Sequence, residues 1–192
     1  MSTQLYVCFL ENDLSLMESH WLNRMAAKLA PPVGVNNKPK IHVELFFPSE
    51  QQQDDERVSG EACSIYYNGS VFLTHKNFSR TQWCFRTLDI TKEQYNNVYR
   101  FCNNHVGDPF NHLTYFTYPL GCKQATPYWS TRFGMKPKWF CSEIVVEALK
   151  AGNILGQNVH PSMHPQHLFT LLEESSTPDC ARNYDKMKLV FT

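Results

Sequence analysis

The sequence has little of several features that announce a function. Its 18 lysines and arginines are balanced by 18 aspartates and glutamates, so there is no basic excess for nucleic acid or for an anionic membrane surface. No apolar run approaches the length of a membrane span, and residues 1–8 lack the basic and apolar pattern of a secretion signal. We therefore expect a cytoplasmic protein with no nucleic-acid partner and no stable membrane insertion.

Motifs typical of cofactor and metal sites are also missing. There is no GxGxxG, GxxxxGK(S/T) or GxSxG pattern, so the sequence gives no support for a bound nucleotide or for a serine nucleophile. His160, His164 and His167 lie close together in the sequence, but Pro161 and Pro165 interrupt any helix that would align them. We expect no cofactor and no metal.

The cysteine content argues against a disulfide-stabilised fold. Seven cysteines are present without a CxxC pair, and an odd, scattered set fits a reducing compartment better than a disulfide framework. The chain of 192 residues is long enough for one complete hydrophobic core and short for two. We expect a single domain over residues 1–192.

Hydrophobic periodicity predicts an α+β domain in which helices flank an antiparallel sheet of about five to six strands. Asn68-Gly69 between two apolar runs predicts a hairpin with a type I′ turn. The aromatic-rich and proline-rich segment 108–137 is too long for an ordinary loop, and we interpret it as a wall of a functional site. The expected strands are 5–10, 40–48, 62–67, 71–75, 82–90 and 186–191, and the expected helices are 14–29, 92–106, 138–151 and 165–174.

One predicted helix carries a cysteine, Cys141, in its first turn, and Gly152 at its C-terminal stop. The unpaired N–H groups and the helix dipole favour an anion there, so a thiol at this place can ionise below its ordinary pKa. Glu143 opposes this effect because it adds a negative charge to the same turn. The alternative is a buried structural thiol. The predicted buried face of the helix comprises Ile144, Val145, Ala148 and Leu149.

A second informative stretch is the predicted strand 40–48, whose period is two. Val43 and Leu45 face the core together with Ile41, which leaves His42 and Glu44 side by side on the opposite face. A carboxylate in this position can orient the imidazole or balance its charge. The alternative is a histidine without a catalytic role, since this spacing is common.

Together, the two stretches resemble a known family. A strand with His42-Val43-Glu44, then further strands, a capped helix, and Trp139-Phe140-Cys141-Ser142-Glu143 opening a helix is similar to the circularly permuted papain-like thiol hydrolases of the NlpC superfamily. These are the YiiX-type proteins, with lecithin retinol acyltransferase-like enzymes as distant kin. In the permuted branch the histidine strand precedes the nucleophile helix, as it does here. The resemblance spans most of the chain and implies a permuted papain-like fold.

The resemblance implies Cys141 as the nucleophile, His42 as its base and Glu44 as the residue that orients the ring. A thiolate–imidazolium pair attacks an acyl carbon to form a thioester, and the backbone N–H of Cys141 would be one oxyanion donor. We expect an amide bond as the target, in a peptide or an amide-linked conjugate, because the context of Cys141 does not match the acyltransferase branch. The alternatives are a lipid acyl hydrolase or acyltransferase, and a non-catalytic binding or structural protein that retains the fold.

Overall fold

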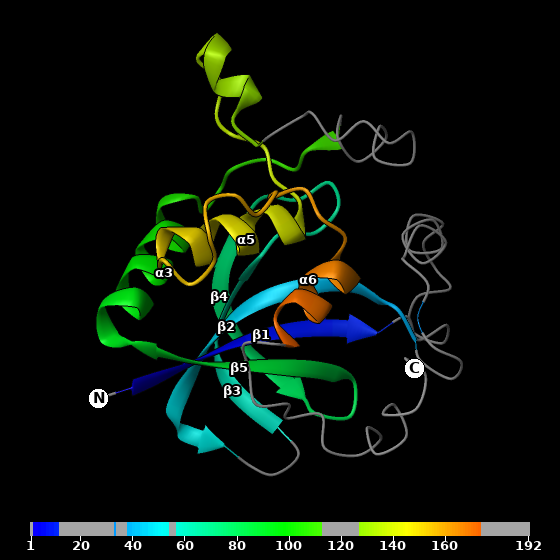
Figure 1. Cartoon of the computed structure of the whole chain (residues 1–192), viewed down its shortest axis with the longest axis vertical. Helices are drawn as coiled ribbons and strands as arrows, with labels where there is room; N and C mark the ends of the chain where they lie inside the picture. The colour runs from blue at the N-terminus through cyan, green and yellow to red at the C-terminus, as the bar shows by residue number, and fades with distance from the viewer. Residues whose placement is uncertain (1, 12–32, 34–37, 54–56, 113–126, 174–192) are drawn as a thin grey trace, which may run out of the picture.

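The computed structural model describes residues 2–11, 33, 38–53, 57–112 and 127–173. Over these ranges the protein is an α+β domain with a five-stranded antiparallel sheet and three α-helices (Figure 1), as the sequence predicted. The predicted helix 14–29 and the predicted strand 186–191 lie outside the described residues.

The strands appear in the order β4-β3-β2-β1-β5, and each neighbouring pair is antiparallel. A 3-10 turn, η2 (Trp129–Phe133), precedes helix α5 (Cys141–Ala151) and projects from the body at the top of Figure 1. The elements are β1 (Ser2–Glu11), β2 (Lys40–Gln53), β3 (Arg57–Ser64), β4 (Phe72–Ser79), β5 (Trp83–Thr91), α3 (Lys92–Asn104), η2 (Trp129–Phe133), α5 (Cys141–Ala151) and α6 (Pro165–Leu171).

The sheet is curled so that its two edge strands meet. β4 and β5 lie at opposite ends of the strand order, yet only residues 80–82 connect them. A flat five-stranded sheet would separate its edges by roughly 19 Å, whereas the four Cα steps of this connection span at most about 14 Å. Phe78 of β4 therefore packs on Trp83 and Phe85 of β5, with ring centroids 4.6 and 6.3 Å apart. The sheet consequently has an outer face and an enclosed inner face.

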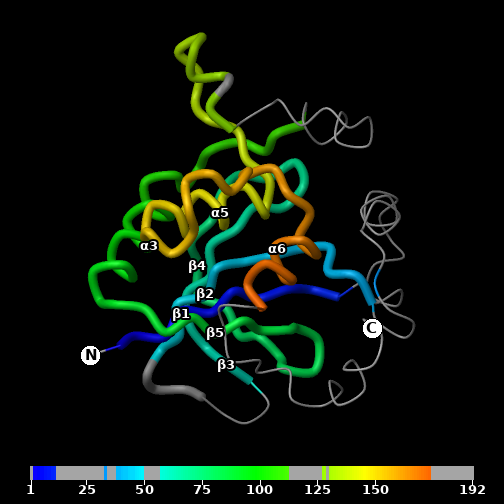
Figure 2. Tube along the Cα trace, in the orientation of Figure 1, coloured from blue at the N-terminus to red at the C-terminus, as the bar shows by residue number. Residues whose placement is uncertain are grey.

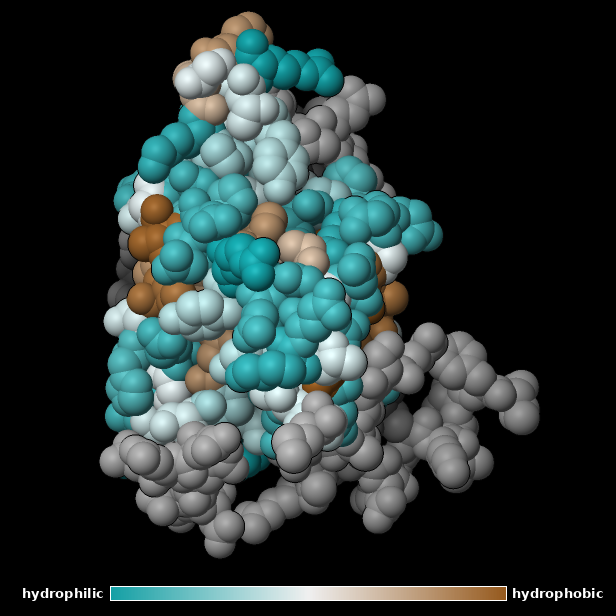
Figure 3. Space-filling model, turned by 90° about the vertical axis from the view of Figure 1, so that its left-hand side faces the viewer, coloured by the Kyte–Doolittle hydropathy of each residue, from teal (hydrophilic) through white to brown (hydrophobic). Residues whose placement is uncertain are grey.

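The outer face carries the larger hydrophobic core. Helices α3, α5 and α6 cover it, with α5 in contact with both of the others (Figures 1 and 2). Val43 and Leu45 of β2 are fully buried against these helices, as the period of two predicted. The predicted apolar face of α5 is also fully buried. Figure 3 shows that the surface on the α3 side is mainly hydrophilic, with apolar side chains in separate patches.

The inner face is apolar too. Phe46, which lies on the same face of β2 as His42 and Glu44, is fully buried between the rings of Tyr6 and Phe78. Glu44 itself is 0% exposed. Because burial of an unpaired carboxylate is very costly, this position requires hydrogen-bonding partners from neighbouring elements.

The β3–β4 hairpin forms as predicted, but its turn differs from the prediction. The connection runs over 65–71, and the Gly69 N–H donates to the Tyr66 carbonyl at 2.9 Å. Asn68 has a φ of 58°, whereas Gly69 has no positive φ. A type I′ turn needs a positive φ at both central residues, so that prediction is wrong. The longer connection brings Tyr66 next to the His42 ring.

Two predicted helix boundaries are confirmed, the cap of α3 at Thr91 and the end of α5 at Gly152. The reason for glycine at the second boundary differs from the predicted one. Thr91 caps α3 by accepting from the Gln94 N–H, and the Gln94 side chain completes the capping box. Gly152 is the C-cap of α5, but its φ is −82° and Asn153 takes the left-handed conformation instead. A Cβ on Gly152 would lie 2.5 Å from Cγ2 of Val98. Glycine is therefore required there for the close approach of α3.

Among the described residues, no helix is both long enough and apolar enough to cross a membrane.

Candidate functional site

Cys141 is the first residue of α5 and is half-buried. Its backbone N–H belongs to the first turn, where no carbonyl within the helix accepts. The preceding N–H, that of Phe140, donates to Oε2 of Glu143 at 2.9 Å. The helix thus begins at the residue that the sequence analysis placed in its first turn.

The segment that leads into Cys141 is anchored to the end of α3. Trp139 is fully buried, and its Nε1–H donates to Oδ2 of Asp108 at 3.1 Å. The same oxygen lies 2.7 Å from Nδ1 of His105. Phe110 and Tyr128 pack on Phe140 and Trp139, with centroids 5.4 Å apart in each pair. These contacts agree with the predicted aromatic wall, although residues 113–126 of that segment lie outside the described residues.

His42 meets Cys141 at the end of the sheet where β1 ends and β2 and β5 begin. Its ring lies close enough to the Cys141 side chain for the two groups to interact. The ring stacks on Tyr66, with centroids 5.0 Å apart and planes 21° apart, and meets the edge of Trp83 at 6.2 Å. With a side chain only 13% exposed, His42 is held in one orientation.

The charge of His42 is set by its neighbours. Burial disfavours the imidazolium, but the charge and hydrogen bond of Cys141, followed by those of Glu44, outweigh burial and raise the pKa of His42 to about 9. The ring is therefore protonated at neutral pH. Nε2 lies 3.2 Å from Oε1 of Glu44, and since an imidazolium carries one N–H on each nitrogen, Nδ1 is the donor available to the Cys141 sulfur.

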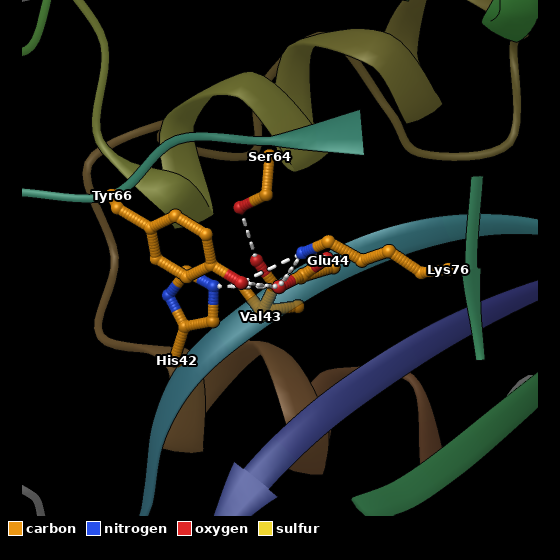
Figure 4. A network of polar contacts seen from close by, with 6 residues as sticks. All are labelled: His42, Val43, Glu44, Ser64, Tyr66 and Lys76. Atoms are coloured by element: carbon orange, nitrogen blue, oxygen red, sulfur yellow. Dashed lines mark hydrogen bonds and ion pairs between the residues drawn. The ribbon is translucent and has the colours of Figure 1, made fainter. Parts of the chain in front are cut away.

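Glu44 is the centre of a polar network on the inner face (Figure 4). Besides His42, it accepts from the Tyr66 hydroxyl at 2.8 Å and from Nζ of Lys76, which lies 3.0 Å from Oε1 and 2.8 Å from Oε2. Burial raises the pKa of Glu44, but His42 and then Lys76 together lower it below its ordinary value. Glu44 is therefore an ionised carboxylate next to the imidazole, as its predicted orienting role requires.

Sequence reasoning missed Tyr66, Lys76 and Trp83. Tyr66 and Trp83 carried no signal, because each lies near His42 only through the pairing of strands that are separate in the sequence: Tyr66 follows β3 next to β2, and Trp83 and His42 are both Cα partners of Leu10. Lys76 did carry a signal in the sequence, because on β4 it shares a face with Phe72 and Phe78. A lysine on an apolar strand face requires a counter-ion, and this pattern was visible in the sequence.

Glu143 plays a different part from the one predicted. Its side chain is fully buried and accepts hydrogen bonds from Phe140 N–H and from the Ser162 hydroxyl. Burial raises the pKa of Glu143 to about 7, although Ser162, Phe140 and Asn111 oppose this by hydrogen bonding. A large fraction of Glu143 is therefore neutral at physiological pH, which weakens its opposition to a charge on Cys141.

The histidines near α6 serve the local backbone. Nδ1 of His164 accepts from the Gln166 N–H and caps α6, and Nδ1 of His160 accepts from the Ser162 N–H. Among the described residues, no group of histidine, cysteine, aspartate and glutamate side chains is placed to hold a metal ion.

Comparison with known proteins identifies no relative that could help to interpret this geometry. No family model, no curated protein and no solved structure matches the chain. The chemical interpretation of the site therefore depends on the geometry around Cys141 and on the sequence motifs that contain the site residues.

Proposed function

We propose that the chain is a thiol hydrolase of the circularly permuted papain-like kind, in the NlpC superfamily, acting through Cys141, His42 and Glu44. The observation that carries this proposal is the proximity of His42 and Cys141, whose interaction raises the pKa of the imidazole. Glu44 supports the ring from its other side at 3.2 Å. A nucleophile, its base and an orienting carboxylate in this order form the constellation of nucleophilic acyl transfer.

The reaction then proceeds in two steps. The Cys141 thiolate attacks the carbonyl carbon of an amide, and the C–N bond breaks as His42 gives its proton to the leaving amine, which leaves an acyl thioester. Neutral His42 next takes a proton from water, and the resulting hydroxide attacks the thioester. The carboxylic acid leaves, and thiolate and imidazolium are restored. Glu44 stays ionised and keeps the ring oriented throughout.

The oxyanion of the tetrahedral intermediate would form near the start of α5. The backbone N–H of Cys141 supplies one donor there, and the positive end of the helix dipole adds to it. A developing negative charge is therefore stabilised more strongly than the neutral carbonyl of the substrate, which is the condition for faster reaction.

We propose an amide in a peptide or an amide-linked conjugate as the substrate. A lipid ester is the rival within the same chemistry, because a thioester intermediate serves both. A non-catalytic protein that retained the fold would not require Cys141 to interact with His42, nor an ionised carboxylate to be buried behind the ring. Here Cys141 raises the pKa of His42, and the pKa of the buried Glu44 is lowered.

The pH dependence of iodoacetamide alkylation, read by peptide mass mapping, tests the proposal. We expect Cys141 to react first among the seven thiols, with a midpoint below the roughly 8.5 of a free thiol. His42→Ala should slow this reaction at pH 6.5 by about tenfold or more. His75→Ala is the matched control, because His75 bonds to Ser59 away from this site.

Two outcomes decide the matter. If Cys141 reacts no faster than Cys84, the other half-buried cysteine of the described residues, or if His42→Ala leaves its rate unchanged, the proposal fails. If the expected pattern holds, matched amide and ester substrates tested on wild type and Cys141→Ala assign the bond that is cleaved.

A further inference from the structure

We propose that Lys76, assisted by Tyr66, is a positioning residue of this site: it holds the Glu44 carboxylate charged and in place, so that Glu44 keeps His42 protonated and directed at Cys141. This inference rests on the proposed function, because it assigns a further residue to the same reaction. Lys76 acts through Glu44 and does not touch the sulfur.

Lys76 reaches Glu44 across an intervening strand. It lies on β4, the edge strand, whereas Glu44 lies on β2, and β3 runs between them. On the inner face β3 presents only small side chains here: Gly60 is the Cα partner of Lys76, and Ala62 follows two residues later. The lysine stem can therefore cross above β3 (Figure 4).

The ammonium group is held in an apolar surrounding that strengthens its interaction with the carboxylate. Nζ lies 4.1, 4.8 and 5.9 Å from the ring centroids of Phe72, Tyr66 and Phe78. The side chain is only 22% exposed, and Glu44 is not exposed at all. With little water between the two charges, their attraction is screened far less than that of a surface pair.

The other groups that face Glu44 do not replace this cation. Cys8 of β1 is the Cα partner of Glu44. Its thiol is kept neutral because burial raises the pKa of Cys8 well above the ordinary value. From the β3–β4 connection comes the Tyr66 hydroxyl, a neutral donor. Of the two cations that lower the pKa of Glu44, His42 and Lys76, His42 is the one whose charge changes during the reaction. Lys76 thus provides the constant positive charge.

Tyr66 joins the two ends of the network. Its ring stacks on His42, its hydroxyl donates to Glu44, and Nζ of Lys76 lies 2.7 Å from the hydroxyl oxygen. The tyrosine is 50% exposed, so apolar burial alone does not account for its fixed position. A displaced Lys76 would release the hydroxyl and with it one wall of the His42 site.

The test uses the same alkylation profile on the full chain. We expect Lys76→Met to shift the Cys141 midpoint upward by about one pH unit and to slow alkylation at pH 6.5 about tenfold. Lys76→Arg keeps the charge and should retain most of the rate. Tyr66→Phe keeps the stacked ring but loses one hydrogen bond to Glu44, so it should have a smaller effect in the same direction.

Lys92→Met is the matched control. Lys92 also lies over an aromatic ring, at 4.7 Å from the centroid of Tyr95, but it is on α3 and away from Glu44. If Lys76 had a purely structural role, the pH midpoint of Cys141 alkylation would be the same in Lys76→Met and in Lys92→Met. That result would overturn the inference. If Lys76→Met does not fold, as judged by circular dichroism, the polar and neutral Lys76→Gln takes its place.

A double-mutant comparison separates this inference from the proposed function. Because Lys76 acts through Glu44, Lys76→Met in a Glu44→Gln background should shift the midpoint no further. An additional full shift in that background counts against the inference. If His42→Ala slows Cys141 but Lys76→Met does not, only the role of Lys76 is lost. If His42→Ala itself has no effect, both proposals fall.

Discussion

Charges alternate along the buried side chains that end at Cys141. Lys76 is positive, Glu44 negative and His42 positive, and each contacts the next through a hydrogen bond. Burying any one of them alone would be strongly unfavourable. In this series each charged group is paired with the next, which is how a fully buried carboxylate is tolerated near Cys141.

Glu143 supplies a pH-dependent prediction at the other side of Cys141. Its pKa is raised from 4.5 to about 7, so the folded state binds more protons than the unfolded state between these values. The stability that this proton binding confers is complete below pH 4.5 and is lost as the pH rises through about 7. We therefore expect the unfolding free energy of Glu143→Gln minus that of wild type to rise by of the order of 3 kcal/mol between pH 4.5 and pH 8.

Urea unfolding of both proteins across this pH range measures the effect. Glu93→Gln is the control, because Glu93 also lies in the first turn of a helix, α3, but is exposed. A difference between wild type and Glu143→Gln that does not change with pH would show that Glu143 titrates normally in the folded state.

Helix α5 presents Cys141 because both of its ends are fixed by other elements. At the N-terminus, Asp108 binds the Trp139 indole and ties the preceding segment to α3. At the C-terminus, Gly152 lies against Val98 of α3. The direction of the helix, and with it the place of the thiol beside His42, depends on these two contacts with one neighbouring helix.

Gly152→Ala tests the C-terminal contact. The added Cβ would lie 2.5 Å from Val98 Cγ2 and 3.2 Å from the Gln94 carbonyl oxygen, so α5 and α3 must separate. We expect a loss of about 1–3 kcal/mol in unfolding free energy, measured by urea denaturation. Gly156→Ala is the control, because its Cβ would meet only the movable end of the Asn158 side chain. Equal losses in the two variants would contradict a tight α3–α5 contact.

The curl of the sheet makes one site from parts that lie on different layers. Cys141 belongs to a helix on the outer face, whereas His42 and Glu44 point to the inner face. They meet at the end of the sheet, where β2 and β5 begin. Trp83 of β5 and His42 of β2 are both Cα partners of Leu10 on β1, and their rings lie 6.2 Å apart.

Phe78 is the residue on which this closure most depends. It is 2% exposed and touches the rings of Phe46, Trp83 and Phe85. Phe78→Ala should lower the unfolding free energy by about 3–5 kcal/mol, because it leaves a cavity between the edge strands. Thermal and urea unfolding measure this loss.

Val106→Ala is the control for Phe78→Ala. Val106→Ala truncates an exposed side chain, 45% of which is accessible, and should cost less than about 0.5 kcal/mol. A Phe78→Ala variant as stable as Val106→Ala would mean that the edge strands are not held together by their rings.

Local patterns in the sequence were sufficient for part of the site. The spacing of apolar residues placed Cys141 in the first turn of α5, and a period of two put His42 and Glu44 on one face of β2. These predictions succeeded because helical and strand periods are properties of a few adjacent residues. The turn at Asn68-Gly69 was predicted wrongly because the neighbouring residues are held by segment 107–110, which lies far along the chain.

The sequence by itself determined which of the described elements form and which faces they bury, since both follow from near neighbours. Tertiary structure alone decided that Glu44 is a buried ion paired with Lys76, that Tyr66 and Trp83 enclose His42, and that Gly152 serves a helix contact. The physical reason is that burial, charge pairing and close approach depend on distances between residues far apart in the chain. Those distances are set here by the pairing of β2 with β1, β3 and, through β3, β4, and by the packing of α5 on α3.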